Sequence, residues 1–348
     1  MKNEPDVNRR DLMDHINSKY SIDIEKISFI PVGEFAYSYQ LQSSDKKKYF
    51  LKMYESNRLT KNKLHSLDFS IDVAYQLNQD KQISQVIFPI KTKVGLLKTN
   101  FASFEMVIWS YVEGSMIKED QRNTKEFMTK LGELLARIHK TTDSLNYKEK
   151  NVLDFELDFK NDLLISLKEA TECVNSKDKN YNKLQRRIKP QMDNILQSLI
   201  YLEELAEGLK GSAKLDSVIC HSDPINHNIL NDKDDEIHLI DWDSAILAPY
   251  ELDIWFYLND KYLDDFIYSY RQVRKVERIN EDFIAFLFYK RILEDLTDWI
   301  YRILFEEITK EQIESDFAGL EEDIFPVLPN MKKIENKLRE NARKWIEI

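Results

Sequence analysis

The chain has 348 residues, of which 43% are hydrophobic, and it carries a formal net charge of −11. This length predicts two lobes or two domains with sizeable cores. An acidic protein repels phosphate backbones, so the charge disfavours nucleic acid as the main partner and favours cationic small molecules.

The two cysteines, Cys173 and Cys220, lie far apart in the sequence. They exclude a disulfide framework and a cysteine-based zinc site, and they fit a reducing compartment. The first twenty residues lack the apolar core of a signal peptide, and no run approaches the length of a membrane span. We therefore expect a soluble, cytoplasmic protein that does not bind membranes.

The N-terminal third predicts a small β-rich lobe. In chain order we expect a helix at 6–20 capped by Asp6 or Asn8, a three-strand meander at 26–54, a helix at 61–78, and strands at 86–90 and 104–109. Few glycines and prolines interrupt the pattern, and there is no internal repeat.

The remainder predicts a large helical lobe. Apolar residues at helical spacing indicate helices at 124–142, 155–175 and 181–209 and from about 251 to the C-terminus. One segment, "VICHSDPINHNILNDKDDEIHLIDWDSA" at 218–245, interrupts them with two short apolar strands. The predicted organisation is an N-terminal lobe at 1–109, a connector at 110–115 and a helical lobe at 116–348.

The interrupting segment concentrates polar side chains that can perform chemistry. Asp223 and Asn228 follow the first short strand, and Asp241 ends the second. Two strands of a hairpin would bring Asn228 and Asp241 together. One carboxylate and one amide oxygen suit Mg²⁺, and a further carboxylate, Asp223, can accept the proton of an attacking hydroxyl. This set is typical of phosphoryl transfer.

The segment has two alternative interpretations. Zinc would use His221, Asp223 and His227, but the chain offers no second cluster with ligand spacing. The acidic run "NDKDDE" at 231–236 is typical of a solvated hairpin tip. His221 is interpreted as a residue that braces the loop.

Phosphoryl transfer also requires a phosphate-binding loop and a lysine in the N-terminal lobe. The loop is expected around Gly33, and Lys52 lies in the otherwise apolar strand "KKYFLKMY". The lysine needs an acidic partner on the next helix. Asp68 lies within that helix's apolar stripe and is the predicted partner, with Asp72 as the alternative.

The motifs together resemble the aminoglycoside phosphotransferase family. The similarity rests on "CHSDPINHNIL", "IHLIDWDSAILAPYELDIWF", "LGELLARIH" at 131–139 and "FEMVIWSYVEG" at 104–114. Within the family the chain is most similar to spectinomycin-type phosphotransferases. The resemblance implies an α+β, two-lobed protein-kinase-like fold, with a small β-rich N-terminal lobe and a large, mainly helical C-terminal lobe.

The resemblance also implies roles for matching positions. Asp223 is the expected catalytic base, Asn228 and Asp241 the metal ligands for Mg²⁺, and Lys52 the lysine that binds the phosphates of ATP or GTP. The segment Ser110, Tyr111 and Val112 would offer backbone groups to the purine, and Ile108 or Trp109 would shape its pocket. Asp253 would brace the catalytic loop, and His139 would be a packing residue. Asp243 would contact the metal or the loop, and a capping role is the equal alternative.

Two departures from the family pattern bear on specificity. The phosphate loop contains one glycine, Gly33, which leaves GTP open as a donor. The stretch 224–227 replaces the small and basic residues often found in the catalytic loop, which leaves the acceptor open.

The acceptor is expected against the predicted helix at 286–307. There Glu294, Asp295, Asp298 and Trp299 stand at helical spacing and would form an acidic face with an aromatic wall. Such a face suits ammonium groups, and a solvated helix face is the alternative. Three functions stay open: an aminocyclitol antibiotic phosphotransferase, a metabolic kinase of a choline-, homoserine- or sugar-type alcohol, or a catalytically silent nucleotide-binding protein.

Overall fold

The computed structural model describes residues 4–31, 33, 35–57, 60–147, 150–172, 179–210 and 217–347. Cys173 lies outside these residues. The chain divides into two compact units. Unit 1 comprises Met1–Leu153, Asp216–Asp253 and Asp260–Lys275, and unit 2 comprises Asp154–Leu215, Ile254–Asn259 and Val276–Ile348.

The elements follow the expected order of a β-rich part and then a helical part. The strands are β1 Ile24–Ile30, β2 Ala36–Ser43, β3 Lys48–Tyr54, β4 Thr99–Phe101, β5 Phe104–Ser110, β6 Gly114–Met116, β7 Ser217–Cys220, β8 Ile229–Asp232, β9 Ile237–Leu239 and β10 Ile246–Pro249. The helices are α1 Arg9–Lys19, α2 Lys61–Tyr75, α3 Glu119–Arg122, α4 Lys125–Lys140, α5 Lys160–Glu172, α6 Lys179–Ile188, α7 Met192–Lys210, α8 Glu251–Ile254, α9 Leu263–Val273, α10 Glu281–Phe305, α11 Lys310–Gly319 and α12 Met331–Glu347.

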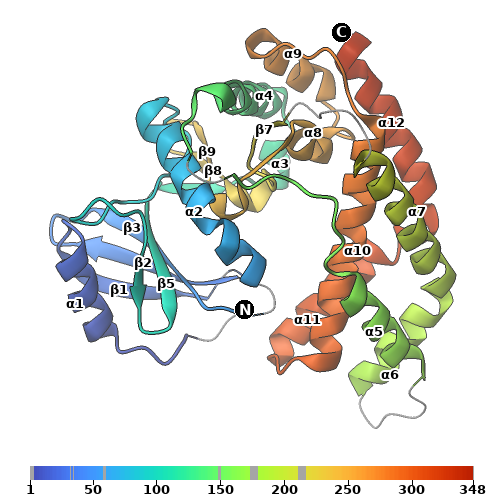
Figure 1. Ribbon diagram of the computed structural model, residues 1–348, viewed down its shortest axis with the longest axis horizontal. Coiled ribbons are helices and arrows are strands. Elements are labelled where there is room, and N and C mark those ends of the chain that lie inside the picture. Colours follow the sequence, from blue (N-terminus) through green and yellow to red (C-terminus); the bar gives the residue numbers. More distant parts are fainter. Residues whose placement is uncertain are drawn as a thin grey trace. The chain divides into compact units, whose positions relative to one another are not determined.

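An antiparallel sheet in the order β1-β2-β3-β5-β4 forms the N-terminal part of unit 1 (Figure 1). Helix α1 covers one of its faces. The Asn8 side chain accepts hydrogen bonds from the N–H groups of Arg10 and Asp11, so Asn8 rather than Asp6 caps this helix. Leu12 and Ile16 of α1 join alternate sheet residues in a buried apolar cluster, which fixes the face that each strand residue occupies.

The strand register assigns Lys52 to the opposite face. Lys52 pairs with Val107 and Phe50 pairs with Trp109, while Leu51 pairs with Ile108 on the face that α1 covers. Successive strand residues alternate between faces. Phe50, Lys52, Tyr54, Val107 and Trp109 therefore share the face that α1 leaves uncovered.

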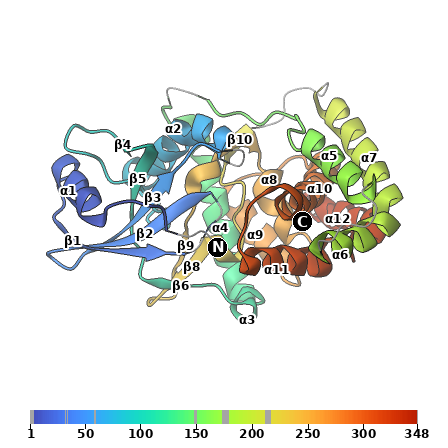
Figure 2. The ribbon, with the colours of Figure 1, turned by 90° about the horizontal axis from the view of Figure 1, so that it is seen from below.

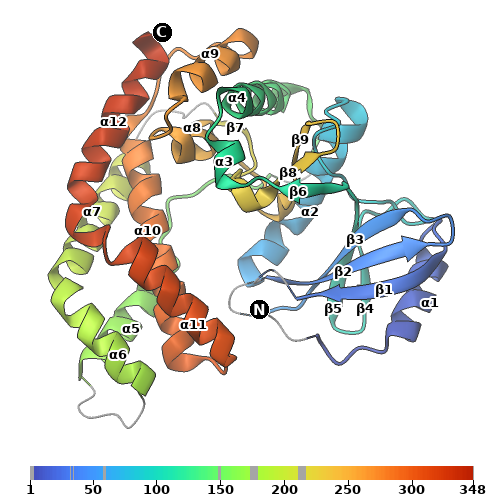
Figure 3. The same ribbon diagram turned by 180° about the vertical axis from the view of Figure 1, so that it is seen from behind.

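The short strands of the polar segment pair differently from the prediction. We expected "SVIC" and "IHLI" to form one hairpin. Instead β7 pairs with β10 in a two-stranded sheet, whereas β9 pairs with β8 in the three-stranded sheet β6-β8-β9 (Figure 3). Hydrophobic alternation identifies strands but not their partners. The acidic run does form the tip of the β8–β9 hairpin, and Lys233 to Glu236 are exposed.

Three further elements differ from the expected ranges. Residues 86–90 make only isolated bridges, from Val86 to Leu239 and from Pro89 to Trp109, because a proline cannot donate to a strand ladder. The helix expected at 155–175 begins only at Lys160, as α5. The helix expected at 181–209 is divided into α6 and α7 by a 3-10 turn that contains Pro190.

Unit 2 is helical, and α10 is its longest helix (Figure 2). Helix α10 packs against α5, α7, α11 and α12. An added Cβ on Gly319 of α11 would lie 2.6 Å from the Trp299 ring of α10, so this crossing requires glycine. Among the described helices, none is long and apolar enough to cross a bilayer.

Candidate active site

The β8–β9 hairpin brings the two expected metal ligands of unit 1 to neighbouring backbone positions. The Ile240 N–H donates to the Asn228 carbonyl at 2.9 Å, directly beyond the last ladder pair, Ile229–Leu239. Asp241 follows in a left-handed conformation with φ of 64°. A non-glycine residue adopts this conformation at an energetic cost, which is common at functional sites.

Asp223 and Asn228 are held together by hydrogen bonds. The Asn228 side-chain amide donates to both the backbone carbonyl and Oδ2 of Asp223, each at 2.9 Å. The same carboxylate oxygen lies 3.4 Å from Nε2 of His227. Because the Asn228 nitrogen is used in this way, its amide oxygen is oriented away from Asp223 and remains a suitable oxygen ligand.

A buried network centred on Asp253 fixes the loop before Asp223. The Asp253 carboxylate accepts from the N–H groups of His221 at 2.8 Å and Ser222 at 2.7 Å. It also contacts Nε2 of His139 at 3.0 Å, and Nδ1 of His139 contacts the Tyr270 hydroxyl at 2.6 Å. Asp253 thus contacts the loop as the brace that the family pattern implies, and burial lowers the pKa of His139, which favours its neutral form.

His221 also bridges two parts of the loop. Its Nε2 donates to the Ile240 carbonyl at 2.7 Å, and its Nδ1 accepts from the Asp223 N–H at 3.3 Å. The ring is fully buried and packs edge-on against Trp242. Both ring nitrogens are therefore engaged, which disfavours the zinc interpretation.

The Lys52 ammonium reaches this hairpin from β3. Its Nζ lies 2.8 Å from Asp241 and 2.7 Å from Asp243. Burial lowers the pKa of Lys52, but the charges of the two aspartates outweigh it and raise the pKa above its usual value. Lys52 therefore stays protonated, as a lysine that binds phosphate must.

The predicted partner of Lys52, Asp68, lies elsewhere. The Asp68 carboxylate pairs with Lys98 at 3.0 Å, and Lys98 also contacts Glu105 of β5. The alternative, Asp72, accepts from Gln76 one turn along α2. The Asp68 prediction is corrected: the side chain is largely exposed, and the carboxylates that contact Lys52 come from the hairpin.

Residues 110–112 of the connector after β5 remain the predicted contact for the purine of the nucleotide. The Ser110 N–H already donates to Phe88 at 2.8 Å, and the Tyr111 hydroxyl accepts from Gln40 at 3.0 Å. A purine would therefore use other backbone groups of 110–112, including those of Val112. Trp109 shares the face of Lys52, whereas Ile108 belongs to the cluster beneath α1, so only Trp109 can shape a pocket beside Lys52.

Gly33 lies between β1 and β2, where the phosphate loop is expected. Its φ of 87° is a conformation that only glycine adopts without strain. An added Cβ would meet its nearest neighbour, the Ala36 carbonyl, only at 3.9 Å. The backbone conformation, rather than crowding, therefore requires glycine at this position.

In unit 2, the predicted acceptor residues lie along α10. Arg291 pairs with Asp295 at 2.8 Å, Lys290 lies 3.6 Å from Glu294, and Trp299 packs against Gly319. Burial raises the pKa of Asp295 to about 6, against the opposing charge of Arg291. The face therefore combines carboxylates, one of them with a raised pKa, with an aromatic ring, although cations of the same helix partly neutralise it.

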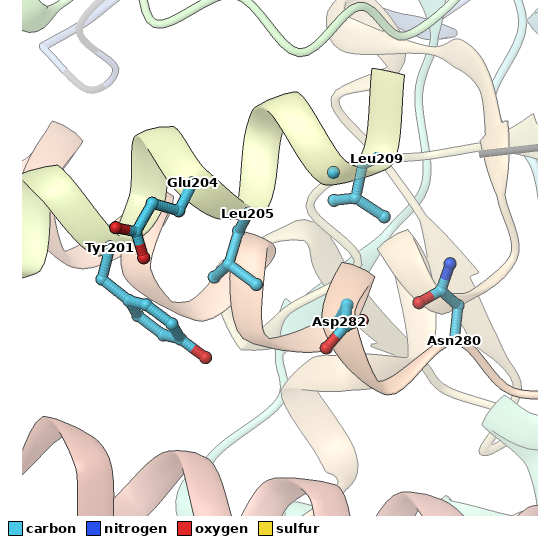
Figure 4. A pocket seen from close by; sticks show the side chains of 7 residues that line it. Tyr201, Glu204, Leu205, Leu209, Asn280 and Asp282 are labelled. Carbon is cyan, nitrogen blue, oxygen red and sulfur yellow. The ribbon is translucent and has the colours of Figure 1, made fainter. Parts of the chain in front are cut away.

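A separate cavity of about 440 Å³ lies in unit 2 between α7 and the start of α10 (Figure 4). The residues that line it are Tyr201, Glu204, Leu205, Gly208, Leu209, Asn280 and Asp282. The predicted acceptor residues are not among them. The Asp282 carboxylate is paired with Arg339 at 2.8 Å, so one of the two acidic side chains that line the cavity already has a cationic partner.

The sequence-based interpretation does not include Tyr54 among the site residues, and it gives Asp243 no definite role. Asp243 is buried against Lys52, and Tyr54 is buried on the same sheet face. The period of two along β3 would have placed Tyr54 beside Lys52. No local signal identifies Asp243 as the lysine's partner, because the two residues are 191 positions apart.

Comparisons with known proteins identify solved structures that share the fold. The spectinomycin phosphotransferase in complex with ADP and spectinomycin has a TM-score of 0.72 and 21% identity, and the alignment covers 99% of this chain and 100% of that one. The microcompartment-associated aminopropanol kinase has a TM-score of 0.62 and 14% identity, over 94% and 98% of the two chains. Choline kinase from Cryptosporidium parvum Iowa II has a TM-score of 0.52 and 14% identity, over 98% and 100%.

No curated protein sequence matches the chain significantly. The solved structures share its two-lobed, protein-kinase-like α+β fold. The model of the phosphotransferase enzyme family matches residues 26–278, which is well over half of the sequence and includes Lys52, Asp223, Asn228 and Asp241. The chain therefore belongs to the phosphotransferase enzyme family.

Proposed function

We propose that this phosphotransferase transfers the γ-phosphoryl group of ATP or GTP, with Mg²⁺, to a hydroxyl of a small cationic acceptor. The acceptor we favour is an aminocyclitol antibiotic of the spectinomycin type. The observation that supports phosphoryl transfer is the convergence of Lys52, Asp241, Asn228 and Asp223 on one hairpin. A catalytically silent protein would have no need for all four.

In this proposal the chain's residues divide the work as follows. Asp223 aligns the acceptor hydroxyl and takes its proton, and Lys52 binds the donor phosphates. Asn228 and Asp241 offer one amide oxygen and one carboxylate, a hard-oxygen set that fits Mg²⁺. When bound, the cation neutralises charge on the phosphoryl oxygens.

The acceptor preference rests on charge and on the names of similar structures. Glu294, Asp295 and Asp298 with Trp299 present carboxylates and an aromatic ring, which suit an ammonium group, and the net charge of −11 adds to this attraction. One similar structure contains spectinomycin and another contains amicoumacin.

A metabolic kinase of a small amino alcohol is the second candidate. The aminopropanol kinase and the choline kinase share the fold and are covered almost completely by this chain. A choline-, homoserine- or sugar-type alcohol would then replace the antibiotic as the acceptor, with the same residues at the phosphate side.

The test is a panel of aminocyclitols and small alcohols, each with ATP and with GTP, in which release of the nucleoside diphosphate is measured. We expect transfer to at least one cationic acceptor. Asp223→Asn should lower kcat by about 10²–10⁴-fold while nucleotide binding by calorimetry persists. Asp234→Asn, on the exposed tip of the same hairpin, is the matched control. Full activity in Asp223→Asn would contradict the assignment.

A further inference from the structure

The two carboxylates that contact Lys52 in unit 1 differ in their exposure to solvent. The Lys52 side chain is 10% exposed and that of Asp243 is 4% exposed, whereas that of Asp241 is 45% exposed. A buried carboxylate cannot readily exchange its partner for water, but an exposed one can. The Lys52–Asp243 contact is therefore the one of the two that is better shielded from water.

Asp243 is held in place by its own backbone. The left-handed conformation at Asp241 turns the chain into a single 3-10 turn, Trp242–Ser244, and the Trp242 indole N–H donates to Leu239 at 3.1 Å. This turn packs against α2, and the Ser70 hydroxyl of α2 donates to the Ala245 carbonyl at 3.3 Å. These contacts fix the backbone that carries the Asp243 carboxylate.

Tyr54 lies on the same face of the sheet as Lys52. It lies two positions after Lys52 on β3, on the same face, and is almost fully buried. Burial, and after it the charge of Asp243, raise the pKa of Tyr54 well above its usual value. The hydroxyl therefore stays protonated.

Helix α2, which supplies the lysine's partner in the sequence-based prediction, has its acids engaged elsewhere. Asp68 contacts Lys98, and Asp72 accepts from Gln76. In the structure Asp243, which lies two residues after the metal-ligand candidate Asp241, contacts Lys52 instead.

We propose that Asp243 is the positioning residue that holds Lys52 for the donor phosphates. Asp241 can then release Lys52 and bind the metal. This inference rests on the proposed function for its kinetic consequence, but the ion pair itself can be tested without any acceptor. Asp243 is then neither a metal ligand nor a catalytic residue.

The first test measures the Lys52 amine directly. The full chain without nucleotide is treated with an amine-reactive reagent, and the modification rate of the Lys52 peptide is followed by mass spectrometry. Asp243→Asn should raise this rate several-fold, since losing the buried one of its two carboxylate contacts lets the Lys52 amine leave its buried position and reach the reagent. Asp68→Asn should leave the rate unchanged. An unchanged rate in Asp243→Asn, or a raised rate in Asp68→Asn, overturns the proposal.

The second test separates positioning from metal binding. Asp243→Asn should lower kcat by about 10²-fold, the effect of a misplaced phosphate contact, while Mg²⁺ affinity in the presence of a non-hydrolysable ATP analogue changes less than about twofold. Asp241→Asn should weaken that Mg²⁺ affinity at least about tenfold. Equal losses of Mg²⁺ affinity in the two variants would identify Asp243 as a ligand and overturn the proposal.

A milder variant guards against misfolding. Ser70→Ala removes only the hydroxyl that holds the turn carrying Asp243, and it should raise the labelling rate of Lys52 several-fold with Mg²⁺ affinity preserved. If Asp243→Asn does not fold, an unaltered labelling rate in Ser70→Ala contradicts the proposal. If wild type transfers phosphate to no acceptor, the proposed function fails while the labelling result still decides the role of Asp243.

Discussion

The carboxylates around Lys52 and those on α10 differ in how far along the sequence their partners lie. Lys52 meets Asp241 and Asp243 across 189 and 191 residues, whereas Glu294 and Asp295 pair with Lys290 and Arg291, one helical turn away. A pair at i, i+4 forms in any exposed helix with that spacing. A contact across the whole fold forms only when the fold does, so the first region says more about function than the second.

Exposure reinforces this difference. Asp243 and Lys52 are nearly buried, while the side chains of Glu294 and Asp295 are 41% and 30% exposed. The exposed charge of Glu294 can therefore change with little effect on folding, whereas the charges at the hairpin depend on each other.

The largest expected effect is at Asp253. Asp253→Ala leaves the N–H groups of His221 and Ser222 and the His139 ring without their shared acceptor in a fully buried site. The free energy of unfolding, from urea denaturation, should fall by about 3–5 kcal/mol. Asp234→Asn on the exposed hairpin tip should change it by less than about 0.5 kcal/mol. Equal losses would remove the contrast between buried and exposed acids.

Lys52→Met and Arg291→Met compare the two regions directly. Each removes the cation of one ion pair, and the first leaves the buried Asp243 without its ammonium. We expect unfolding to become easier by about 3 kcal/mol for Lys52→Met and by less than about 1 kcal/mol for Arg291→Met. A Lys52→Met protein as stable as wild type would show that the pair contributes nothing to the fold.

Neutralising the α10 face should affect acceptor binding more than chemistry. Glu294→Gln and Asp298→Asn should each raise the KM of a cationic acceptor about 2–5-fold, the worth of one exposed charge pair, with kcat unchanged. Steady-state kinetics at saturating nucleotide measures both constants. A KM that does not change in either variant would place the acceptor elsewhere and leave α10 a solvated face.

The smallest expected effect is a pH dependence at Asp295. Its pKa is raised by burial to about 6, whereas an unfolded chain has about 3.9. The folded protein therefore binds a proton that the unfolded chain has released, so this group's contribution to stability is lost as pH rises through about 6. Subtracting the urea midpoints of Asp295→Asn from those of wild type between pH 4.5 and 7.5 should give a curve that falls with pH. A flat curve would contradict the raised pKa.

The sequence predicted the fold and the residues near the site better than their pairing. Apolar alternation and helical spacing identified the meander and α4, because burial follows a local period. The partner of β7 could not be predicted, since "SVIC" fits β9 and β10 equally well by pattern. Asp68 was predicted for Lys52 because it lies on an apolar stripe, but a stripe does not say which charge lies opposite, and here it is Lys98.

Trp109 and Trp242 lie near the proposed phosphate-binding site, so their fluorescence can report on it. Trp109 lies on the sheet face of Lys52, and Trp242 opens the 3-10 turn of Asp243, with its ring 4.8 Å from that of His221. They are two of five tryptophans in the chain. Nucleotide that draws Lys52 from Asp241 changes the charge around both indoles, so we expect binding at this site to be visible as a change of intrinsic fluorescence, without any label.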